Sequence, residues 1–359
     1  RSDLGVQPGS LVAGVFPSKR LHDGDYSEDG EEQMSAEQDN TGFACLFPGQ
    51  GAQAVGMAVD LCAESPRAHE VFRRGGEILG FDILAVCAEG PAEELNATRI
   101  SQPAIFLHSM AVLEALAERR GVEGSFGQGL AAAAASGLSL GEYSALVFVG
   151  ALEFEDALQV VGKRGEFMQE ACDQGEGTMA AVVGMGASEI EAVVTGTREA
   201  GFEVGVANYN SPAETVISGS TEGVAECSRR LEEAGARKVV ALRVAGAYHS
   251  VLMESATRKL QPWLEDLSIS VPRLPFFGNY PGARVEDPEE IREGLLRQIE
   301  NPVRWEQCVR GVLAMGCSTA LELGPGKVLR GHVRKIDREA VVESISDIVS
   351  LDNMGVVPV

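Results

Sequence analysis

Residues 136–147 read SGLSLGEYSALV and place one serine, Ser139, between two glycines. The apolar segment GLAAAAASG that leads into it is typical of a strand, and a helix is expected from about Leu140. A strand, then Gly-x-Ser-x-Gly, then a helix is the pattern of a nucleophile elbow, in which a sharp turn exposes the serine Oγ. The glycines let strand and helix pass closely, and the backbone N–H groups after the serine can stabilise an oxyanion. A plain tight turn stays the alternative, because the chain contains 42 glycines.

The segments around this turn predict an α/β protein with a small insert. A buried strand is expected at Phe43–Phe47, and a longer helix over roughly residues 154–171. From residue 176 the pattern changes to strand 178–183, helix 187–199, strand 203–208, strand 214–219, helix 221–235 and strand 238–244. This βαββαβ order is typical of a ferredoxin-like unit.

Three parts of the chain are therefore expected. Residues 41–175 and 245–350 form a discontinuous core with a parallel sheet, and residues 176–244 form the ferredoxin-like subdomain. Residues 1–40 carry nine acidic and three basic residues, few apolar ones and no periodic pattern. We expect this segment to be a disordered acidic extension.

Composition argues against several kinds of partner. The formal net charge of −23 disfavours general nucleic-acid binding, because phosphate is repelled by such a surface. No segment is expected to approach the roughly 20 apolar residues of a membrane span, so no membrane partner is predicted. The seven cysteines contain no C-x-x-C pair and no histidine at ligand spacing. This spacing favours reduced, mostly buried thiols without a metal site, and no cofactor is implied.

A serine nucleophile usually needs a base, and the chain has five histidines. His22 lies in the acidic extension, His69 in a charged segment, His108 on an apolar helical stretch and His332 in the basic run RGHVRK. His249, in VAGAYHSVLM, follows the last strand of the insert, where the chain re-enters the core. By elimination His249 is the best candidate for the base.

Arg164 is unusual because it lies on an otherwise apolar helix face. Ala157, Val161, Arg164 and Met168 are spaced at i, i+4, i+7 and i+11. Burying a guanidinium on such a face costs free energy unless an anion binds it through hydrogen bonds. That anion is either an internal carboxylate such as Asp156 or a substrate carboxylate close to Ser139, and the sequence pattern leaves both open.

Seven segments in consistent order, between about Phe43 and Ile336, resemble the malonyl-CoA:acyl carrier protein transacylases of fatty acid synthesis. They are FPGQGAQAVGM, GLSLGEYSALVFVGAL, KRGEFMQEA, NYNSPAETVISG, GAYHS, LLRQIENPVRW and ELGPGKVLRGHVRKI. The resemblance implies an α/β-hydrolase-like core with a ferredoxin-like insert, in agreement with the changes of pattern near residues 176 and 245.

The resemblance also implies roles for particular residues. Ser139 would be the nucleophile, His249 its base, and Arg164 the bidentate partner of a malonyl carboxylate. The backbone N–H groups of Gln50 and Leu140 would form the oxyanion hole. Asn210, in NYNSPAETVISG, would contact substrate.

Enzymes of this family lack a third acid, and a backbone carbonyl at the position of Gln298 orients the histidine. Asn301-Pro302 should end the helix there, which leaves its last carbonyls without intrahelical partners. An α/β-hydrolase proper would instead have an acid between serine and histidine in sequence, for example Asp156. We expect the dyad.

Leu138 and the residues before His249 depart from common family patterns. Many bacterial members have histidine at the position of Leu138, and the leucine is similar to plant and plastid-type members. In related polyketide acyltransferases an aromatic residue before the histidine accompanies malonyl selectivity. Tyr248 fits that rule by filling the space of an α-methyl group, whereas Gly246 does not fit the pattern.

The implied reaction is a ping-pong transfer of malonyl from malonyl-CoA to the phosphopantetheine thiol of acyl carrier protein, without a cofactor. The alternatives are a serine esterase or thioesterase on a related scaffold, a polyketide-synthase acyltransferase, and a non-catalytic scaffold. We expect a monomer in a plastid, with the mitochondrion or the bacterial cytoplasm as alternatives. We expect the acidic carrier protein to dock on Lys327, Arg330, Arg334 and Lys335, a solvated helix face being the alternative.

Overall fold

Strand β1 (Phe43–Phe47) lies inside a six-stranded sheet in this computed structural model, which describes residues 42–127 and 129–355. The strand order is β10 (Val341–Ile345), β9 (Thr319–Leu323), β1, β2 (Ala132–Gly137), β7 (Phe276–Gly278) and β8 (Ala283–Val285). All neighbours pair in parallel except β7 and β8, which are antiparallel. The expected parallel sheet is confirmed, and the acidic extension predicted for residues 1–40 lies outside the described residues.

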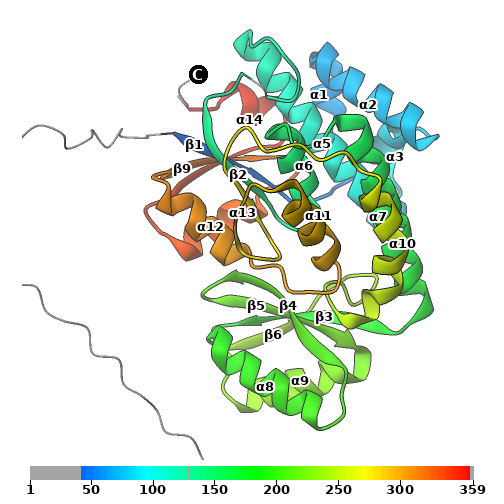
Figure 1. Cartoon of the computed structure of the whole chain (residues 1–359), viewed down its shortest axis with the longest axis vertical. Coiled ribbons are helices and arrows are strands. Elements are labelled where there is room, and N and C mark those ends of the chain that lie inside the picture. Colours follow the sequence, from blue (N-terminus) through cyan, green and yellow to red (C-terminus); the bar gives the residue numbers. More distant parts are fainter. Residues whose placement is uncertain (1–41, 128, 356–359) are drawn as a thin grey trace, which may run out of the picture. The chain divides into compact units, whose positions relative to one another are not determined.

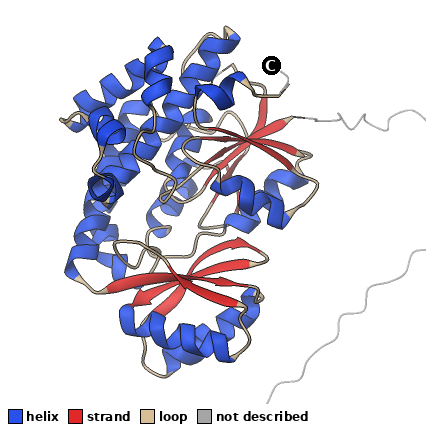
Figure 2. Ribbon diagram, turned by 180° about the vertical axis from the view of Figure 1, so that it is seen from behind, coloured by secondary structure: helices blue, strands red, loops and turns tan. Residues whose placement is uncertain are grey.

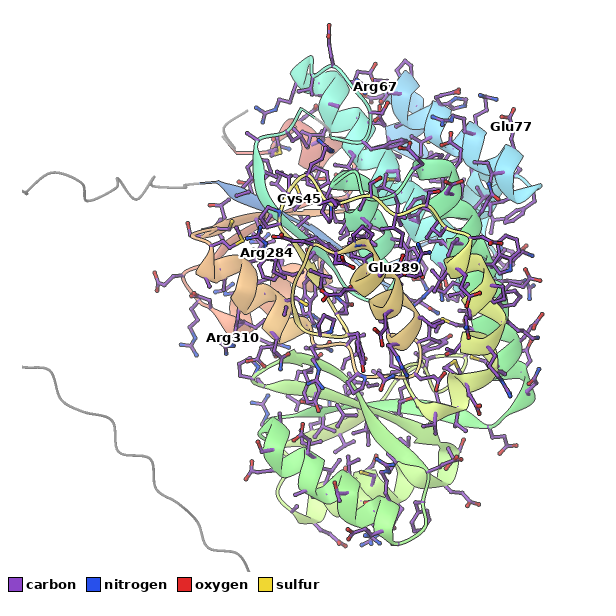
Figure 3. The ribbon with its side chains drawn as sticks, viewed as in Figure 1. Cys45, Arg67, Glu77, Arg284, Glu289 and Arg310 are labelled. Atoms are coloured by element: carbon purple, nitrogen blue, oxygen red, sulfur yellow. The ribbon has the colours of Figure 1, made fainter. Side chains whose placement is uncertain are left out.

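Helices cover both faces of this sheet, as Figure 2 shows. Side chains of β1 alternate between the two faces, with Phe43, Cys45 and Phe47 in one apolar cluster and Ala44 and Leu46 in the other. A strand buried on both faces has a continuous apolar sequence, which accounts for FACLF. Figure 3 shows Cys45 inside the fold, while charged side chains such as Glu77 and Arg310 point outward from helices.

The two helical layers differ in size. The larger layer contains α1 (Val59–Glu64), α2 (Pro66–Leu79), α3 (Ile83–Glu89), α4 (Ala92–Asn96), α5 (Thr98–Arg120), α6 (Gly141–Phe148), α7 (Phe154–Gln174), the 3₁₀ turn η1 (Val251–Met253), α10 (Glu254–Glu265), α11 (Pro288–Arg297) and α14 (Ile348–Asp352). The smaller layer contains α12 (Trp305–Ala314) and α13 (Val328–Ile336). The predicted long helix is α7, and it extends a few residues past the predicted end.

The insert has the predicted βαββαβ order. Its elements are β3 (Gly177–Val183), α8 (Ala187–Glu199), β4 (Val204–Ser211), β5 (Glu214–Ser220), α9 (Thr221–Glu233) and β6 (Lys238–Ala241). They form an antiparallel sheet in the order β4-β5-β3-β6, which α8 and α9 cover on the side away from the core (Figure 1). The last strand is shorter than predicted, because the chain from Leu242 to Ala245 turns to line a cavity.

Side chains of β3 alternate between the helices of the insert and the core side. Ala180 and Val182 pack with α8 and α9, whereas Met179 and Ala181 face the cavity. The insert is joined to the core through β4, where the Tyr209 N–H donates to the Val303 carbonyl (2.9 Å) and the Val303 N–H donates to the Ala207 carbonyl (2.8 Å). One face of the small sheet therefore becomes a wall of the site.

Helix α5 corrects one expectation. Among the described helices it alone is long and apolar enough to cross a membrane. Its apolar stretch is wholly buried in the fold. The expectation that no segment approaches a span is therefore wrong for α5. Its scattered polar residues, including Gln102 and His108, interrupt the apolar run but are themselves buried.

The turn after β2 depends on contacts too close for any side chain. Phe47 pairs with Gly137 at the ends of β1 and β2, and the Leu138 N–H donates to the Phe47 carbonyl (2.9 Å). A Cβ on Gly137 would lie 2.0 Å from the carbonyl carbon of Gly141, and a Cβ on Gly141 would lie 2.2 Å from the carbonyl oxygen of Phe47. The predicted close passage of strand and helix is confirmed.

We expect Gly137→Ala to destabilise the protein by about 1–3 kcal/mol, because backbone atoms must move to admit the methyl group. The matched control is Gly196→Ala within α8, where no atom lies within 4 Å of the added Cβ. That change should be neutral or stabilising by up to about 1 kcal/mol, since alanine favours the helix. Urea denaturation of both variants measures the difference. Equal unfolding midpoints would contradict the steric account of the turn.

Candidate active site

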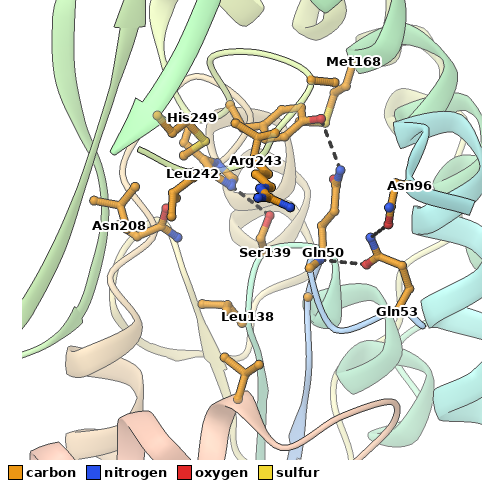
Figure 4. Close-up of a pocket in the computed structure, with 18 of the residues that line it drawn as sticks. Gln50, Gln53, Asn96, Leu138, Ser139, Met168, Asn208, Leu242, Arg243 and His249 are labelled. Atoms are coloured by element: carbon orange, nitrogen blue, oxygen red, sulfur yellow. Dashed lines mark hydrogen bonds between the residues drawn. The ribbon is translucent and has the colours of Figure 1, made fainter. Parts of the chain in front are cut away.

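A cavity of about 890 Å³ lies between the serine turn and the sheet of the insert. Its walls come from the turn, the loop after β1, helix α7, strands β3 to β5 and the segment after β6. The lining residues include Arg164, Met179 and Asn210, together with Gln50, Ser139, Met168, Arg243 and His249, which Figure 4 labels. The loops after β1 and β2 meet because the carboxyl ends of parallel strands share one edge of a sheet, where ligands bind in such folds.

Ser139 and His249 form a hydrogen-bonded pair. The Ser139 Oγ lies 2.9 Å from the His249 Nε2. Both residues have left-handed backbone conformations, with φ of 51° at Ser139 and 56° at His249. Non-glycine residues are held in this region only where the surroundings over-determine the conformation, and such strain is concentrated at functional sites. Here it aims both side chains at each other.

The carbonyl of Gln298 orients the imidazole ring. Helix α11 ends at Arg297, and in a continued helix the Gln298 carbonyl would accept from residue 302. That residue is Pro302, which has no N–H, so the carbonyl is free to accept from the His249 Nδ1–H (2.7 Å). With the proton on Nδ1, the Nε2 lone pair faces the Ser139 hydroxyl.

His249 is neutral at neutral pH. Burial lowers its pKa to about 4, the positive charge of Arg164 adds to this effect, and the Gln298 carbonyl opposes it. A neutral imidazole with its free nitrogen on a serine hydroxyl can accept that proton. The pair therefore has the protonation state of a general base and its nucleophile.

Arg164 is buried beside the serine, with 1% of its surface exposed. Its face of α7 is confirmed as a buried face, because Ala157, Val161 and Met168 are buried as well. The Nη1 donates to Gln102 Oε1 (2.6 Å), and the Nη2 donates to Gln298 Oε1 (2.8 Å) and to Ser139 Oγ (3.1 Å).

No carboxylate of residues 42–127 or 129–355 is paired with this guanidinium. Among the described residues no ion pair includes Arg164, so the internal pair with Asp156 does not form. The Nε is buried without a hydrogen-bond partner. The charge is thus held by neutral amide and hydroxyl oxygens with a donor left over, which is an arrangement ready for an external anion.

Two backbone N–H groups near Ser139 are free of acceptors within the described chain, those of Gln50 and Leu140. Leu140 precedes the first residue of α6, so its N–H has no intrahelical acceptor. Gly49 brings the other loop close, since a Cβ there would lie 2.4 Å from the Leu138 carbonyl oxygen. Donors of this kind can stabilise an oxyanion on a carbonyl attacked by Ser139.

Tyr248 and Asn210 both line the cavity. The Tyr248 hydroxyl is hydrogen-bonded to Thr98 Oγ1 and accepts from Gln50 Nε2 (3.2 Å), which holds the ring in place. Asn210 Nδ2 donates to Glu214 (3.2 Å), and its Oδ1 is buried without a partner. The departure at Gly246 has a packing reason, because a Cβ there would lie 2.4 Å from the Cys172 sulfur.

Within the described part of the chain, His249 alone of the histidines is hydrogen-bonded to Ser139. His108 is buried in α5, where burial lowers its pKa to about 4, as expected for a core histidine. His332 lies 3.5 Å from Glu214 at the cavity wall, and His69 is exposed. The seven cysteines are free and six of them are buried.

Sequence reasoning missed Gln102, Asn279 and Glu142. Asn279, after β7, accepts the Ser139 N–H on its Oδ1 (2.6 Å) and donates to the Gly137 carbonyl (2.7 Å). Gln102 and Asn279 carry no local signal, because their partners lie far away in sequence. Glu142 does carry one, as an acid within the apolar helix GEYSALVF.

A Ser–His pair with open N–H donors, on an α/β core with this insert, defines a serine acyltransferase. The chain belongs to the acyl transferase domain family, whose model matches residues 44–354. It is 41% identical to the malonyl CoA-acyl carrier protein transacylase of Bacillus subtilis over 85% of this chain and 93% of that protein.

Two solved structures have the same fold. One is an acyl carrier protein S-malonyltransferase of Vibrio cholerae, with a TM-score of 0.80 and 36% identity over 87% of this chain and 99% of that chain. The other is a malonyl-transacylase in complex with its type II polyketide synthase acyl-carrier protein. Its TM-score is 0.81, with 35% identity over 87% of this chain and 98% of that chain.

The low pKa of His249 predicts an unusual pH profile for the reactivity of Ser139. Protonation of Nε2 removes the base, so labelling of Ser139 by a fluorophosphonate should decline only as the pH falls toward about 4, where His249 titrates. Labelling rates over pH 4–8 measure this, with circular dichroism at each pH as the control for folding. A decline centred near 6.5, the ordinary pKa of histidine, would contradict the lowered pKa of His249.

Proposed function

We propose that this chain transfers the malonyl group from malonyl-CoA to the phosphopantetheine thiol of acyl carrier protein, through a malonyl ester on Ser139, in type II fatty acid synthesis. The observation that carries the proposal is the buried Arg164 guanidinium, which lies 3.1 Å from the Ser139 Oγ and forms no ion pair with a carboxylate of the described residues. The names of the relatives support the same substrate pair.

In the first half-reaction, Arg164 binds the free carboxylate of malonyl-CoA. The Ser139 Oγ attacks the thioester carbonyl while its proton passes to the His249 Nε2. The resulting oxyanion accepts from the backbone N–H groups of Gln50 and Leu140. The C–S bond then breaks, and CoA leaves as the thiol with the proton from His249.

In the second half-reaction the carrier thiol gives its proton to His249 and attacks the malonyl ester. The C–O bond to Ser139 breaks, and the serine recovers the proton. Two thioesters are exchanged through an oxygen ester, so the transfer requires no cofactor and no energy source. Exclusion of water from the ester favours transfer over hydrolysis.

The proximity of Arg164 to Ser139 selects a short dicarboxylic acyl group. In malonate the free carboxylate carbon lies two bonds from the reacting carbonyl carbon, so a guanidinium beside the serine can reach it. We infer that Tyr248 limits the space for an α-methyl group. We infer that the free Oδ1 of Asn210 accepts an N–H from the pantetheine chain.

The test of the proposal is the acyl-enzyme. Brief incubation with malonyl-CoA should add one malonyl group to the protein, detected by intact mass spectrometry and mapped by peptide digestion. Ser139→Ala should carry none, because the nucleophilic oxygen is gone. Label on Ser139→Ala, or release of malonate to water faster than transfer to a thiol, would contradict the transferase.

Carrier-protein docking is proposed on the cations of α13 and its N-cap. Lys327, Arg330 and Arg334 are exposed, and among the described residues they form no ion pair, whereas Lys335 is paired with Glu214. Val328 and His332 of the same helix line the cavity, so α13 forms part of its wall. An acidic carrier would meet these cations while its prosthetic arm enters the site.

We expect Lys327→Glu/Arg330→Glu to raise KM for acyl carrier protein about tenfold at low salt, and less at high salt because surface charges are screened. Acylation by malonyl-CoA should be unaffected. The control is Arg198→Glu on α8, an exposed arginine on the helical side of the insert. An equal effect of the control, or no salt dependence, would contradict the docking surface.

The compartment and the assembly state stay predictions. The relatives named above are bacterial where their source is given, which favours the bacterial alternative. The plastid proposal depends on Leu138 and the acidic extension. A monomer is proposed, and sedimentation equilibrium measures it directly.

A further inference from the structure

Glu142 is a buried acid that the reaction described above does not use. It lies in the first turn of α6, three residues after Ser139, and 3% of its surface is exposed. Its Oε1 accepts from the Asn279 N–H (2.6 Å), and its Oε2 accepts from the Gln298 Nε2. A buried carboxyl group is costly, so its contacts need an explanation.

The orientation of the Gln298 carboxamide is forced by its partners. Its Oε1 accepts from Arg164 Nη2 (2.8 Å), and its Nε2 donates to the Ser139 carbonyl (3.2 Å) as well as to Glu142. A guanidinium only donates and a carbonyl only accepts, so the reverse orientation satisfies neither. The group at position 142 must therefore be an acceptor.

The Oε1 atom of Glu142 supports the serine turn through Asn279. This oxygen accepts from the backbone N–H of Asn279. The Asn279 side chain in turn accepts from the Ser139 N–H and donates to the Gly137 carbonyl. These bonds hold the backbone of the turn in its left-handed conformation. One carboxylate thus joins the elbow to the segment that carries Gln298.

We propose that Glu142 is a positioning residue, whose two acceptor oxygens orient the Gln298 carboxamide toward Arg164 and hold Asn279 against the serine turn. The inference rests on the proposed function, because Arg164 is the group that binds the malonyl carboxylate. Through Gln298, Glu142 keeps the guanidinium aimed at the space beside the Ser139 Oγ.

The proposed role uses the ionised form of Glu142, which its contacts favour and burial opposes. Burial raises its pKa to about 8, while the Asn279 N–H, the Gln298 amide and the charge of Arg164 lower it. Burial lowers the pKa of Arg164, and the negative charge of Glu142 acts in the opposite direction and raises it. The acid and the guanidinium stabilise each other through a neutral amide rather than by contact, which leaves Arg164 open to substrate.

The test is Glu142→Gln, which keeps size and shape but replaces one acceptor by a donor. The new oxygen should stay on the Asn279 N–H, because a backbone group cannot turn away. The new amide then faces the Gln298 Nε2, and Gln298 turns its own donor toward Arg164. We expect KM for malonyl-CoA to rise about tenfold with a smaller change in kcat. Fluorophosphonate labelling of Ser139 should change less than threefold.

The readout is the ratio of kcat/KM for malonyl-CoA and acetyl-CoA, since acetyl has no carboxylate for Arg164. Glu142→Gln should lower this ratio about tenfold. The matched control is Glu322→Gln, another fully buried acid, which accepts from the Leu329 and Arg330 N–H groups and from Ser344. The control should lower the Tm and leave the ratio unchanged.

Arg164→Ala separates the two hypotheses. If Arg164→Ala leaves the ratio unchanged, the proposed role of Arg164 in binding malonyl fails. If Arg164→Ala lowers the ratio but Glu142→Gln does not, the positioning role of Glu142 is overturned. Should Glu142→Gln fail to fold, Gln298→Met makes the same test, because it keeps the carbonyl for His249 and removes the carboxamide. An unchanged ratio in folded Gln298→Met would also overturn the proposal.

Discussion

The contact between the backbones of Gly137 and Gly141 is the constraint on which the site depends. It lets β2 turn directly into α6 at the edge of the parallel sheet, with Ser139 at the apex. The same edge carries the loop after β1, and Gly49 lets that loop approach the turn. The nucleophile and the two free N–H groups are thus held close together by the backbone, an arrangement that can stabilise an oxyanion.

The charge beside Ser139 is positive, whereas the net charge of the whole chain is negative. The protein has a formal net charge of −23, yet a buried cation, Arg164, donates a hydrogen bond to the Ser139 Oγ. Burial keeps His249 neutral by lowering its pKa, and the positive charge of Arg164 adds to this effect. One guanidinium therefore has two roles in the proposed reaction: it would attract the substrate carboxylate, and it helps burial to hold the base in the form that can accept a proton.

Much of this arrangement could be predicted from sequence because its signals are local. The glycine spacing around Ser139, the face of α7 that carries Arg164, and the strand pattern of the insert are each contained within a few turns or strands. Gln102 and Asn279 could not be predicted in the same way, since each acts through a partner brought near only by the fold. The last strand of the insert ends at Ala241, before the predicted end at residue 244, because the residues after Ala241 line the cavity instead of continuing the sheet. Pro302 was informative for a specific reason, since the N–H it lacks is the one that would have occupied the Gln298 carbonyl.

The proposed binding of a substrate carboxylate next to His249 explains why the partner of its Nδ1–H is a neutral carbonyl. If an aspartate oriented the imidazole, as in a triad, it would lie close to Arg164 and compete with substrate for the guanidinium. The Gln298 carbonyl orients the ring through the same Nδ1–H without adding a negative charge. The carboxamide of the same residue accepts from Arg164 and donates to Glu142, so it bridges the two groups without bringing the acid into contact with the guanidinium. Gln298 therefore separates two demands that a carboxylate could not meet together, an oriented base and an arginine free to receive an anion.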